Sequence, residues 1–167
     1  MRVVGVTGTS GKTVVASMVK SVMDHYCKAA YMGTISLEYD GVEEQCPYTT
    51  PETLYVQKKL FDMARRGVKV VAMDASSHGL ALKRIDAVDF NIAVLTNISD
   101  EHLDFHGTRR QYIESKKKLF SMLSTNSIAV LNKDEEVFAE FKAATKARIM
   151  TYGIKNESEI MAKNIEL

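Results

Sequence analysis

Short β-branched segments alternate with amphipathic segments along this 167-residue chain, and this alternation limits the possible folds more than any other feature. Runs of valine, isoleucine and alanine are typical of buried strands, whereas apolar residues that recur every three or four positions indicate helices. Strand patterns cover residues 2–6, 28–32, 68–73, 92–96, 128–131 and 149–152, and helical patterns cover residues 13–26, 51–67, 108–123 and 135–145. Strands joined by such helices lie parallel, so the sequence predicts an α/β fold with a doubly wound, mostly parallel sheet.

One segment departs from this alternation. Residues 35–39 and 42–45 flank Asp40-Gly41, a dipeptide that favours a tight hairpin turn, so we expect an antiparallel pair of strands there. The sequence contains no internal repeat, low-complexity tract or linker. These observations favour a single domain over residues 1–167.

The composition excludes several classes of protein. The chain has 22 basic and 21 acidic residues, a net charge of +1, which gives no basic surface for nucleic acid. Its apolar runs are too short to cross a membrane, and the N-terminus has no signal-peptide pattern. Cys27 and Cys46 form no CxxC pair, which favours reduced thiols. We therefore expect a cytoplasmic protein with a small-molecule site, bound to neither nucleic acid nor membrane.

A glycine-rich run, Gly5 to Thr13, follows the first predicted strand at the edge where doubly wound sheets bind ligands. Its small residues allow backbone amides to face an anion, Lys12 can reach terminal phosphates, and Thr13 can hold Mg²⁺. The usual phosphate-loop spacing requires glycine where this chain has Val6. The alternative is a turn that only closes the strand and helix, but the flanking patterns favour a loop that binds a nucleoside triphosphate.

Other polar side chains also follow predicted strands. Asp74 ends the strand at 68–73 and is a candidate Mg²⁺ ligand at the same edge of the sheet. His78, His102 and His106 also follow strand ends, and a lone histidine is more often structural than a ligand. We expect His102, which lies among acidic residues at 100–104, to be the metal ligand of the three.

The run Asn132-Lys133-Asp134 partly matches the Asn-Lys-x-Asp pattern of guanine-specific GTPases. Here the aspartate comes one position early. We interpret the run as a loop and helix start, which argues against a GTPase.

Lys116 lies within a run of three lysines, but its neighbours at helical spacing are the apolar Tyr112, Ile113, Leu119 and Phe120. Its stem is therefore predicted on the apolar face of the helix. From the pattern alone, a lysine that extends its amine to water is favoured. The alternative is a desolvated, neutral amine that reacts with CO₂ to form a metal-binding carbamate.

Several separated motifs occur together in a fixed order. They are Gly-Val-Thr-Gly-Thr-Ser-Gly-Lys-Thr at 5–13, Thr-Thr-Pro-Glu at 49–52, Ser-Ser-His-Gly-Leu at 76–80, His-Leu-Asp-Phe-His-Gly-Thr at 102–108, and Tyr112 with Lys116. In this combination the chain resembles the central ATPase domain of the Mur ligases, whose phosphate loop has the same glycine offset. The resemblance covers most of the chain. It implies that residues 1–167 are a partial central ATP-binding domain, incomplete at the C-terminal end, without the family's N-terminal UDP-binding and C-terminal amino-acid-binding domains.

The resemblance also implies an activity. Such a ligase of peptidoglycan synthesis adds a third amino acid, meso-diaminopimelate or L-lysine, to UDP-MurNAc-L-Ala-D-Glu through an acyl phosphate, with ATP and Mg²⁺. One alternative is a nucleotide-binding fragment without turnover. Another is a related ligase of the folylpolyglutamate or cyanophycin synthetase type, against which Thr49-Thr50-Pro51 and Ser76-Ser77-His78 favour the muramyl branch. The oligomeric state is not predicted.

The resemblance assigns roles position by position. The expected ATP-binding residues are Gly8, Thr9, Ser10, Gly11, Lys12 and Thr13; the metal ligands are Thr13, Asp74, His102 and Lys116; and the UDP-MurNAc contacts are Thr49, Thr50, Ser76 and Arg84. Lys12, His102 and Lys116 are the expected catalytic residues, with Lys116 as N6-carboxylysine, which makes the carbamate the preferred interpretation. Asp74 and Glu101 depart from the family's usual glutamate and aspartate, and each changes the reach of a carboxylate by one methylene.

Overall fold

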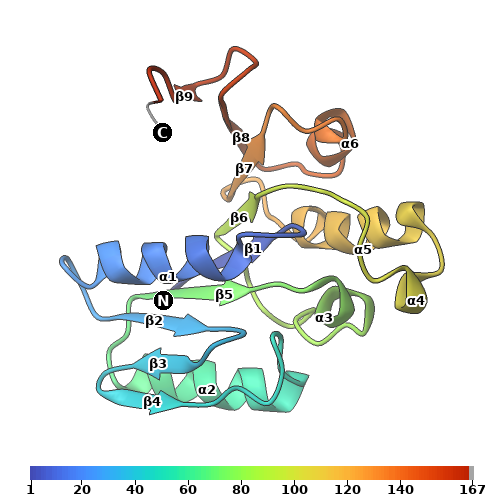
Figure 1. Ribbon diagram of the computed structural model, residues 1–167. Helices are drawn as coiled ribbons and strands as arrows, with labels where there is room; N and C mark the ends of the chain where they lie inside the picture. Colours follow the sequence, from blue (N-terminus) through green and yellow to red (C-terminus); the bar gives the residue numbers. More distant parts are fainter. Residues whose placement is uncertain (166–167) are drawn as a thin grey trace.

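The computed structural model describes residues 1–165 as one nine-stranded sheet with helices packed against it (Figure 1). The strands are β1 (Arg2–Thr7), β2 (Ala29–Met32), β3 (Leu37–Tyr39), β4 (Val42–Glu44), β5 (Val70–Asp74), β6 (Ile92–Leu95), β7 (Ile128–Asn132), β8 (Arg148–Gly153) and β9 (Ile160–Met161). The helices are α1 (Lys12–Met23), α2 (Thr53–Arg65), α3 (Ser77–Ala81), α4 (Leu103–His106), α5 (Arg109–Ser121) and α6 (Phe138–Ala143).

The sheet has the order β4-β3-β2-β5-β1-β6-β7-β8-β9. In the described part of the chain, only β3 runs opposite to the other strands, and the turn between β3 and β4 places Asp40 and Gly41 at φ 46° and 80°. Positive φ at both positions suits the predicted Asp-Gly hairpin. The α/β fold with a mostly parallel sheet and the hairpin are therefore both confirmed.

The structure differs from the predicted elements mainly where segments are short. α3, α4 and β9 were not predicted, because segments of two to five residues are too short to show a hydrophobic period. The helix predicted to reach Tyr26 ends at Met23, and the helix predicted over 135–145 contracts to α6. The boundaries of α5 agree more closely, because Thr108 caps its first turn by accepting the Gln111 N–H at 3.2 Å.

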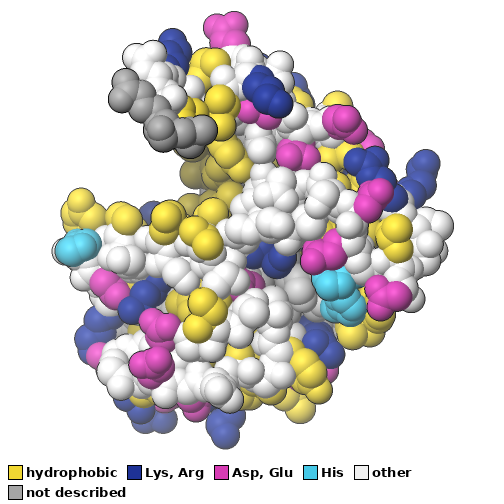
Figure 2. Space-filling model, in the orientation of Figure 1, with side chains coloured by type: hydrophobic (Ala, Val, Ile, Leu, Met, Phe, Trp, Pro, Cys, Tyr) yellow, Lys and Arg dark blue, Asp and Glu magenta, His cyan; other side chains and the backbone are white. Residues whose placement is uncertain are grey.

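The two faces of the sheet are covered unequally. The larger core joins one face to α2, α5 and α6, whereas on the other face a smaller cluster packs beneath α1 alone. The outer side of α1 carries Val14, Met18 and Val22, each more than half exposed, and Figure 2 shows a row of hydrophobic side chains over this helix. Cys27 and Cys46 are free thiols, and within residues 1–165 no helix is long and apolar enough to cross a membrane.

Parallel pairing brings three loop regions to one edge of the sheet. β1 lies between β5 and β6, with Val6 opposite Asp74 and Thr7 opposite Leu95. The segments that leave these three strands therefore begin side by side. Their meeting point is the carboxyl edge of the central strands, where ligands of such sheets bind.

Replacement of Gly5 by alanine tests how tightly α5 packs on β1. A Cβ at Gly5 would lie 2.8 Å from Phe90 Cε1 and 3.0 Å from Leu119 Cδ1. Alanine normally stabilises a strand relative to glycine, but this contact reverses the sign, and we expect G5A to lower the free energy of unfolding by about 1–3 kcal/mol. Urea denaturation measures this change. The exposed V14A substitution is the control and should cost less than about 0.5 kcal/mol; equal costs would contradict the packing argument.

Candidate functional site

The loop between β1 and α1 depends on two glycines with positive φ. Gly8 has φ 145° and Gly11, at the N-terminus of α1, has φ 82°. A Cβ built on Gly8 would lie 1.9 Å from Thr96 Oγ1. Only glycine therefore allows this loop to pack against the segment that follows β6.

That segment, Thr96 to Ser99, holds the loop through several hydrogen bonds and is called here the β6 exit. Thr96 Oγ1 and Asn97 Nδ2 donate to Ser10 O at 2.7 and 2.9 Å. The amides of Thr9 and Ser10 donate in return to Asn97 O at 2.8 Å and Asn97 Oδ1 at 3.0 Å. The loop between Gly8 and Gly11 is thus bonded to the protein on this side.

The side chain of Thr9 also turns inward. Its buried Oγ1 lies 2.8 Å from Tyr112 Oη and accepts the Ser99 N–H at 2.9 Å. Apart from Gly8, the predicted ATP-binding residues therefore divide into two groups. Thr9 and Ser10 use their amides within the protein, whereas Gly11, Lys12 and Thr13 line an open cleft. Hydrogen bonding in α1 begins with the Val15 N–H, bonded to Gly11 O, so the amides of the first turn remain available to an anion.

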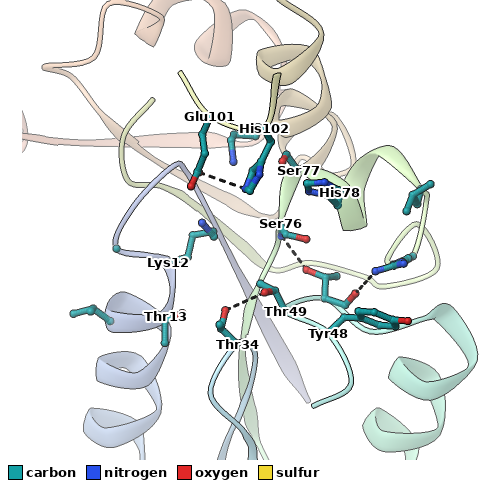
Figure 3. Close-up of a pocket in the computed structure, with 16 residues that line it drawn as sticks. Lys12, Thr13, Thr34, Tyr48, Thr49, Ser76, Ser77, His78, Glu101 and His102 are labelled. Atoms are coloured by element: carbon teal, nitrogen blue, oxygen red, sulfur yellow. Dashed lines mark hydrogen bonds and ion pairs between the residues drawn. The ribbon is translucent and has the colours of Figure 1, made fainter. Parts of the chain in front are cut away.

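The cleft has a volume of about 550 Å³ and lies at the carboxyl edge of the sheet (Figure 3). It brings together nine of the predicted site residues, namely Gly11, Lys12, Thr13, Thr49, Thr50, Ser76, Arg84, His102 and Lys116. Gly8, Thr9, Ser10 and Asp74 do not line it. Thr34, Tyr48, Ser77 and His78 also line the cleft, and none of them is among the predicted site residues. Their positions directly after strands or beside the predicted motifs were the available signal.

Thr50 and Arg84 hold one wall of the cleft in place. Thr50 Oγ1 donates to Asp74 O at 2.7 Å and accepts the Ser76 N–H at 2.9 Å, so this hydroxyl joins two loops. Arg84 bonds to Thr50 O at 3.1 Å, pairs with Glu52 at 2.7 Å, and lies 4.7 Å from the centre of the Tyr48 ring. The hydroxyl oxygens of Thr49 and Thr34 lie 3.2 Å apart. This wall therefore presents Thr49, Ser76 and Arg84 in a fixed arrangement.

Asp74 is fully buried at the end of β5, directly behind Thr13. Its Oδ2 accepts hydrogen bonds from Thr13 Oγ1 at 2.7 Å, Tyr31 Oη at 3.0 Å, and both the amide and hydroxyl of Thr34. Its Oδ1 is buried and makes no hydrogen bond within residues 1–165. A buried carboxylate oxygen without a partner next to a hydroxyl is a donor set that suits Mg²⁺.

Lys116 is buried and does not extend to water. Only 1% of its surface is exposed, its Nζ donates to Gly8 O at 2.7 Å, and it lies 4.4 Å from the centre of the Tyr112 ring. Burial, reinforced by the nearby charge of Lys12, lowers the pKa of Lys116 to about 7. The amine is therefore buried in the structure and does not reach water. Whether that amine becomes a carbamate stays a prediction.

Lys12 folds back over the same carbonyl. Its Nζ donates to Gly8 O at 3.1 Å and to Thr9 O at 2.7 Å. Burial lowers the pKa of Lys12, while the carboxylates of Glu101 and Asp74 act in the opposite direction. Figure 3 shows Lys12 extending from the start of α1 toward Glu101.

Three histidines gather beside the cleft. His102 begins α4 with φ 56°, and its ring lies 4.8 Å from that of His78, while His106 lies 5.5 Å from His78. Burial is the largest cause that lowers the pKa of both His78 and His106. Within residues 1–165 no three His, Cys, Asp or Glu side chains are grouped closely enough to hold a metal, so the metal-binding role of His102 stays a prediction.

Residues 6–167 match the family described as the Mur ligase middle domain. This chain is a member of that family. The family resemblance inferred from the motifs is therefore confirmed, and it accounts for the glycine offset in the loop.

Known Mur ligases match nearly the whole chain. The UDP-N-acetylmuramoyl-L-alanyl-D-glutamate–2,6-diaminopimelate ligase of Caldanaerobacter subterraneus subsp. tengcongensis is 40% identical, covering 99% of this chain and 34% of that protein. The corresponding L-lysine ligase of Staphylococcus epidermidis is 38% identical, covering 97% of this chain and 34% of that protein. Both names are those of MurE enzymes, the branch that the motifs favour. The chain therefore spans about a third of the length of these curated relatives.

A solved structure confirms the fold of this Mur ligase domain. A UDP-N-acetylmuramoyl-L-alanyl-D-glutamate–2,6-diaminopimelate ligase superposes with a TM-score of 0.86 at 31% identity. The match covers 96% of this chain and 34% of that chain. The described sheet and helices are thus those of a Mur ligase middle domain.

Proposed function

We propose that this chain is the ATP-binding part of a MurE-type ligase that adds the third amino acid to UDP-MurNAc-L-Ala-D-Glu. The observation that carries the proposal is the start of α1, where Gly11, Lys12 and Thr13 line the cleft with first-turn amides available. A helix N-terminus with a lysine and a threonine is a phosphate-binding arrangement. The relatives named for ligation of diaminopimelate or lysine support the assigned reaction.

In the proposed reaction, the acceptor carboxylate takes the γ-phosphoryl group of ATP, and the amine of the third amino acid then displaces phosphate. The first step brings two anions together, the acceptor carboxylate and the triphosphate, so the site must supply positive charge. Lys12 would move from the carbonyls of Gly8 and Thr9 to the phosphates, because a charged phosphate oxygen is a stronger acceptor than a peptide carbonyl. The wall of Thr49, Ser76 and Arg84 would hold the UDP-MurNAc substrate, as the family resemblance implies.

Mg²⁺ fits this proposal through Thr13 and Asp74. The free Oδ1 of Asp74 and the adjacent Thr13 hydroxyl are hard oxygen ligands that would hold the ion, directly or through water. When bound, Mg²⁺ would neutralise charge on the phosphates. Asp74 is one methylene shorter than the family's usual glutamate, and its four hydrogen bonds fix the carboxylate at that shorter reach.

Lys116 and His102 complete the proposed metal-binding set. The neutral amine of Lys116 would react with CO₂ to give a carbamate whose oxygens bind a second Mg²⁺, together with His102. The low pKa of about 7 supports this step because the amine, and not the ammonium, is the nucleophile.

A direct test of the carbamate uses ¹³C NMR with ¹³C-labelled bicarbonate. We expect a carbamate carbon signal in the wild-type protein that grows as the pH rises through about 7 at constant dissolved CO₂, because the neutral fraction of Lys116 grows over that range. K116M should lack the signal. K117M, which removes the neighbouring lysine that pairs with Glu114 and Glu140, should retain it; a signal that survives K116M would contradict the assignment.

A second candidate is a nucleotide-binding segment without turnover of its own. The observation that favours it is the coverage, because the chain corresponds to about a third of each MurE relative. Both diaminopimelate and lysine ligases are among these relatives, so the third amino acid is proposed only as one of the two. An ATP-consuming reaction agrees with the cytoplasmic location expected from the sequence.

Calorimetric titration with MgATP tests the proposal at its first step. We expect wild-type protein to bind, and K12A to bind about tenfold or more weakly, because a charge-assisted bond to phosphate is lost. K20A is the matched control, since Lys20 lies at the far end of α1 and pairs with Asp24 and Glu38. Absence of binding by the wild-type protein would contradict the proposal.

Product formation separates the two candidates. ADP release is measured with UDP-MurNAc-L-Ala-D-Glu and either diaminopimelate or lysine. Release that requires both substrates supports the ligase, whereas MgATP binding without ADP release supports the segment without turnover.

A further inference from the structure

The β6 exit, which holds the phosphate loop, is itself held from behind by side chains of β7 and β8. The single hydroxyl hydrogen of Tyr152 is shared between Leu95 O and Thr96 O, which lie 2.9 and 3.1 Å from its Oη. Asn132 Nδ2 donates to Thr96 O at 2.9 Å. Glu135 adds a further bond, since its Oε2 accepts the Ile98 N–H at 3.0 Å. We call Asn132, Glu135 and Tyr152 the brace.

The brace begins where the hydrogen bonding between β6 and β7 ends. The pairing of β6 with β7 ends where Val94 lies opposite Val130, one residue before Leu95. Beyond that point the carbonyls of Leu95 and Thr96 have no strand partner on the β7 side. Backbone carbonyls this deep in a fold require hydrogen-bond donors, and here side chains supply them.

Tyr152 remains a donor under ordinary conditions. Its side chain is half-buried, and burial together with the carboxylates of Glu135 and Asp134 raises the pKa of Tyr152 to about 12. Asp134 fixes the strand that carries this side chain. Its carboxylate accepts the N–H groups of Ile154 and Asn156 at 2.6 and 2.8 Å, which joins the end of β8 to the end of β7.

We propose that Tyr152, supported by Asn132, is a positioning residue for nucleotide binding. Tyr152 fixes the position of the Thr96 carbonyl. It therefore also orients the hydrogen bonds that Thr96 and Asn97 donate to Ser10 O. Ser10 in turn sets the entry of the chain into the first turn of α1. The inference rests on the proposed binding of a nucleoside triphosphate by that turn. It also gives two residues of the Asn-Lys-Asp run a role, because Asn132 belongs to the brace and Asp134 fixes the strand that carries Tyr152.

The experiment compares Y152F with Y39F in the full chain. Each substitution removes one tyrosine hydroxyl. Tyr39 lies in β3, on the other half of the sheet, and its Oη donates to Asp62 of α2 at 2.7 Å. Amide hydrogen exchange is measured at Thr9 and Ser10, whose N–H groups bond to Asn97. MgADP affinity is measured in parallel by calorimetry.

We expect Y152F to speed exchange at Thr9 and Ser10 by about fivefold and to weaken MgADP binding by about the same factor, the effect of one lost hydrogen bond. Y39F should change neither. Unchanged exchange in Y152F, unchanged affinity despite faster exchange, or an equal effect in Y39F would overturn the proposal.

Two further outcomes are distinguishable. If the wild-type protein does not bind MgADP, the proposed nucleotide binding fails, and the positioning role for binding fails with it even if exchange at Thr9 changes. If Y152F does not fold, N132A removes the second donor to Thr96 O and is read by the same two measurements.

Discussion

The close packing of Gly8 against Thr96 is the contact on which the rest of the site depends. Because a Cβ at Gly8 would overlap Thr96 Oγ1, the loop can approach β6 only with glycine at this position. That approach lets Ser10 bond to Thr96 and Asn97. It also directs the Gly8 carbonyl toward α5, where it accepts the buried amine of Lys116. One backbone position thus joins β1, β6 and α5 into a single site.

The Gly8 carbonyl accepts hydrogen bonds from two lysine amines whose positive charge is costly to bury. Lys12 and Lys116 both donate to Gly8 O, and burial lowers the pKa of both amines. Lys12 and Lys116 repel each other whenever both are protonated, and a region of low dielectric compensates such a pair poorly. An anionic ligand at the start of α1 would relieve this repulsion. The electrostatics therefore favour phosphate in the cleft independently of the family resemblance.

Much of the fold could be predicted from the sequence because its long elements bury one regular face. Alternation and turn chemistry identified the sheet and the hairpin, and the motifs indicated most residues of the cleft. The sequence pattern does not predict α3 and α4, because they are about one turn long and are held by tertiary contacts, such as Gly79 packed against Thr50. The periodicity placed the stem of Lys116 on the apolar face, but only the fold decides whether its amine reaches water.

The roles of individual hydroxyls could not be read from the sequence. Thr9 and Thr50 belong to binding motifs, yet their hydroxyls bond within the protein, because partners distant in the chain satisfy them. The brace is equally hidden, since Tyr152 lies more than fifty residues from the carbonyls it contacts. Such contacts depend on the order of strands in the sheet, which local patterns do not encode.

The central claim is that the start of α1 binds the phosphates of a nucleotide. Amide NMR during titration with MgADP tests it most directly, because each backbone N–H reports its own hydrogen bond. The account predicts that the largest shifts occur at Gly11, Lys12 and Thr13, with smaller ones along the β6 exit. Shifts confined to other parts of the chain, or no shifts at saturating MgADP, would contradict it.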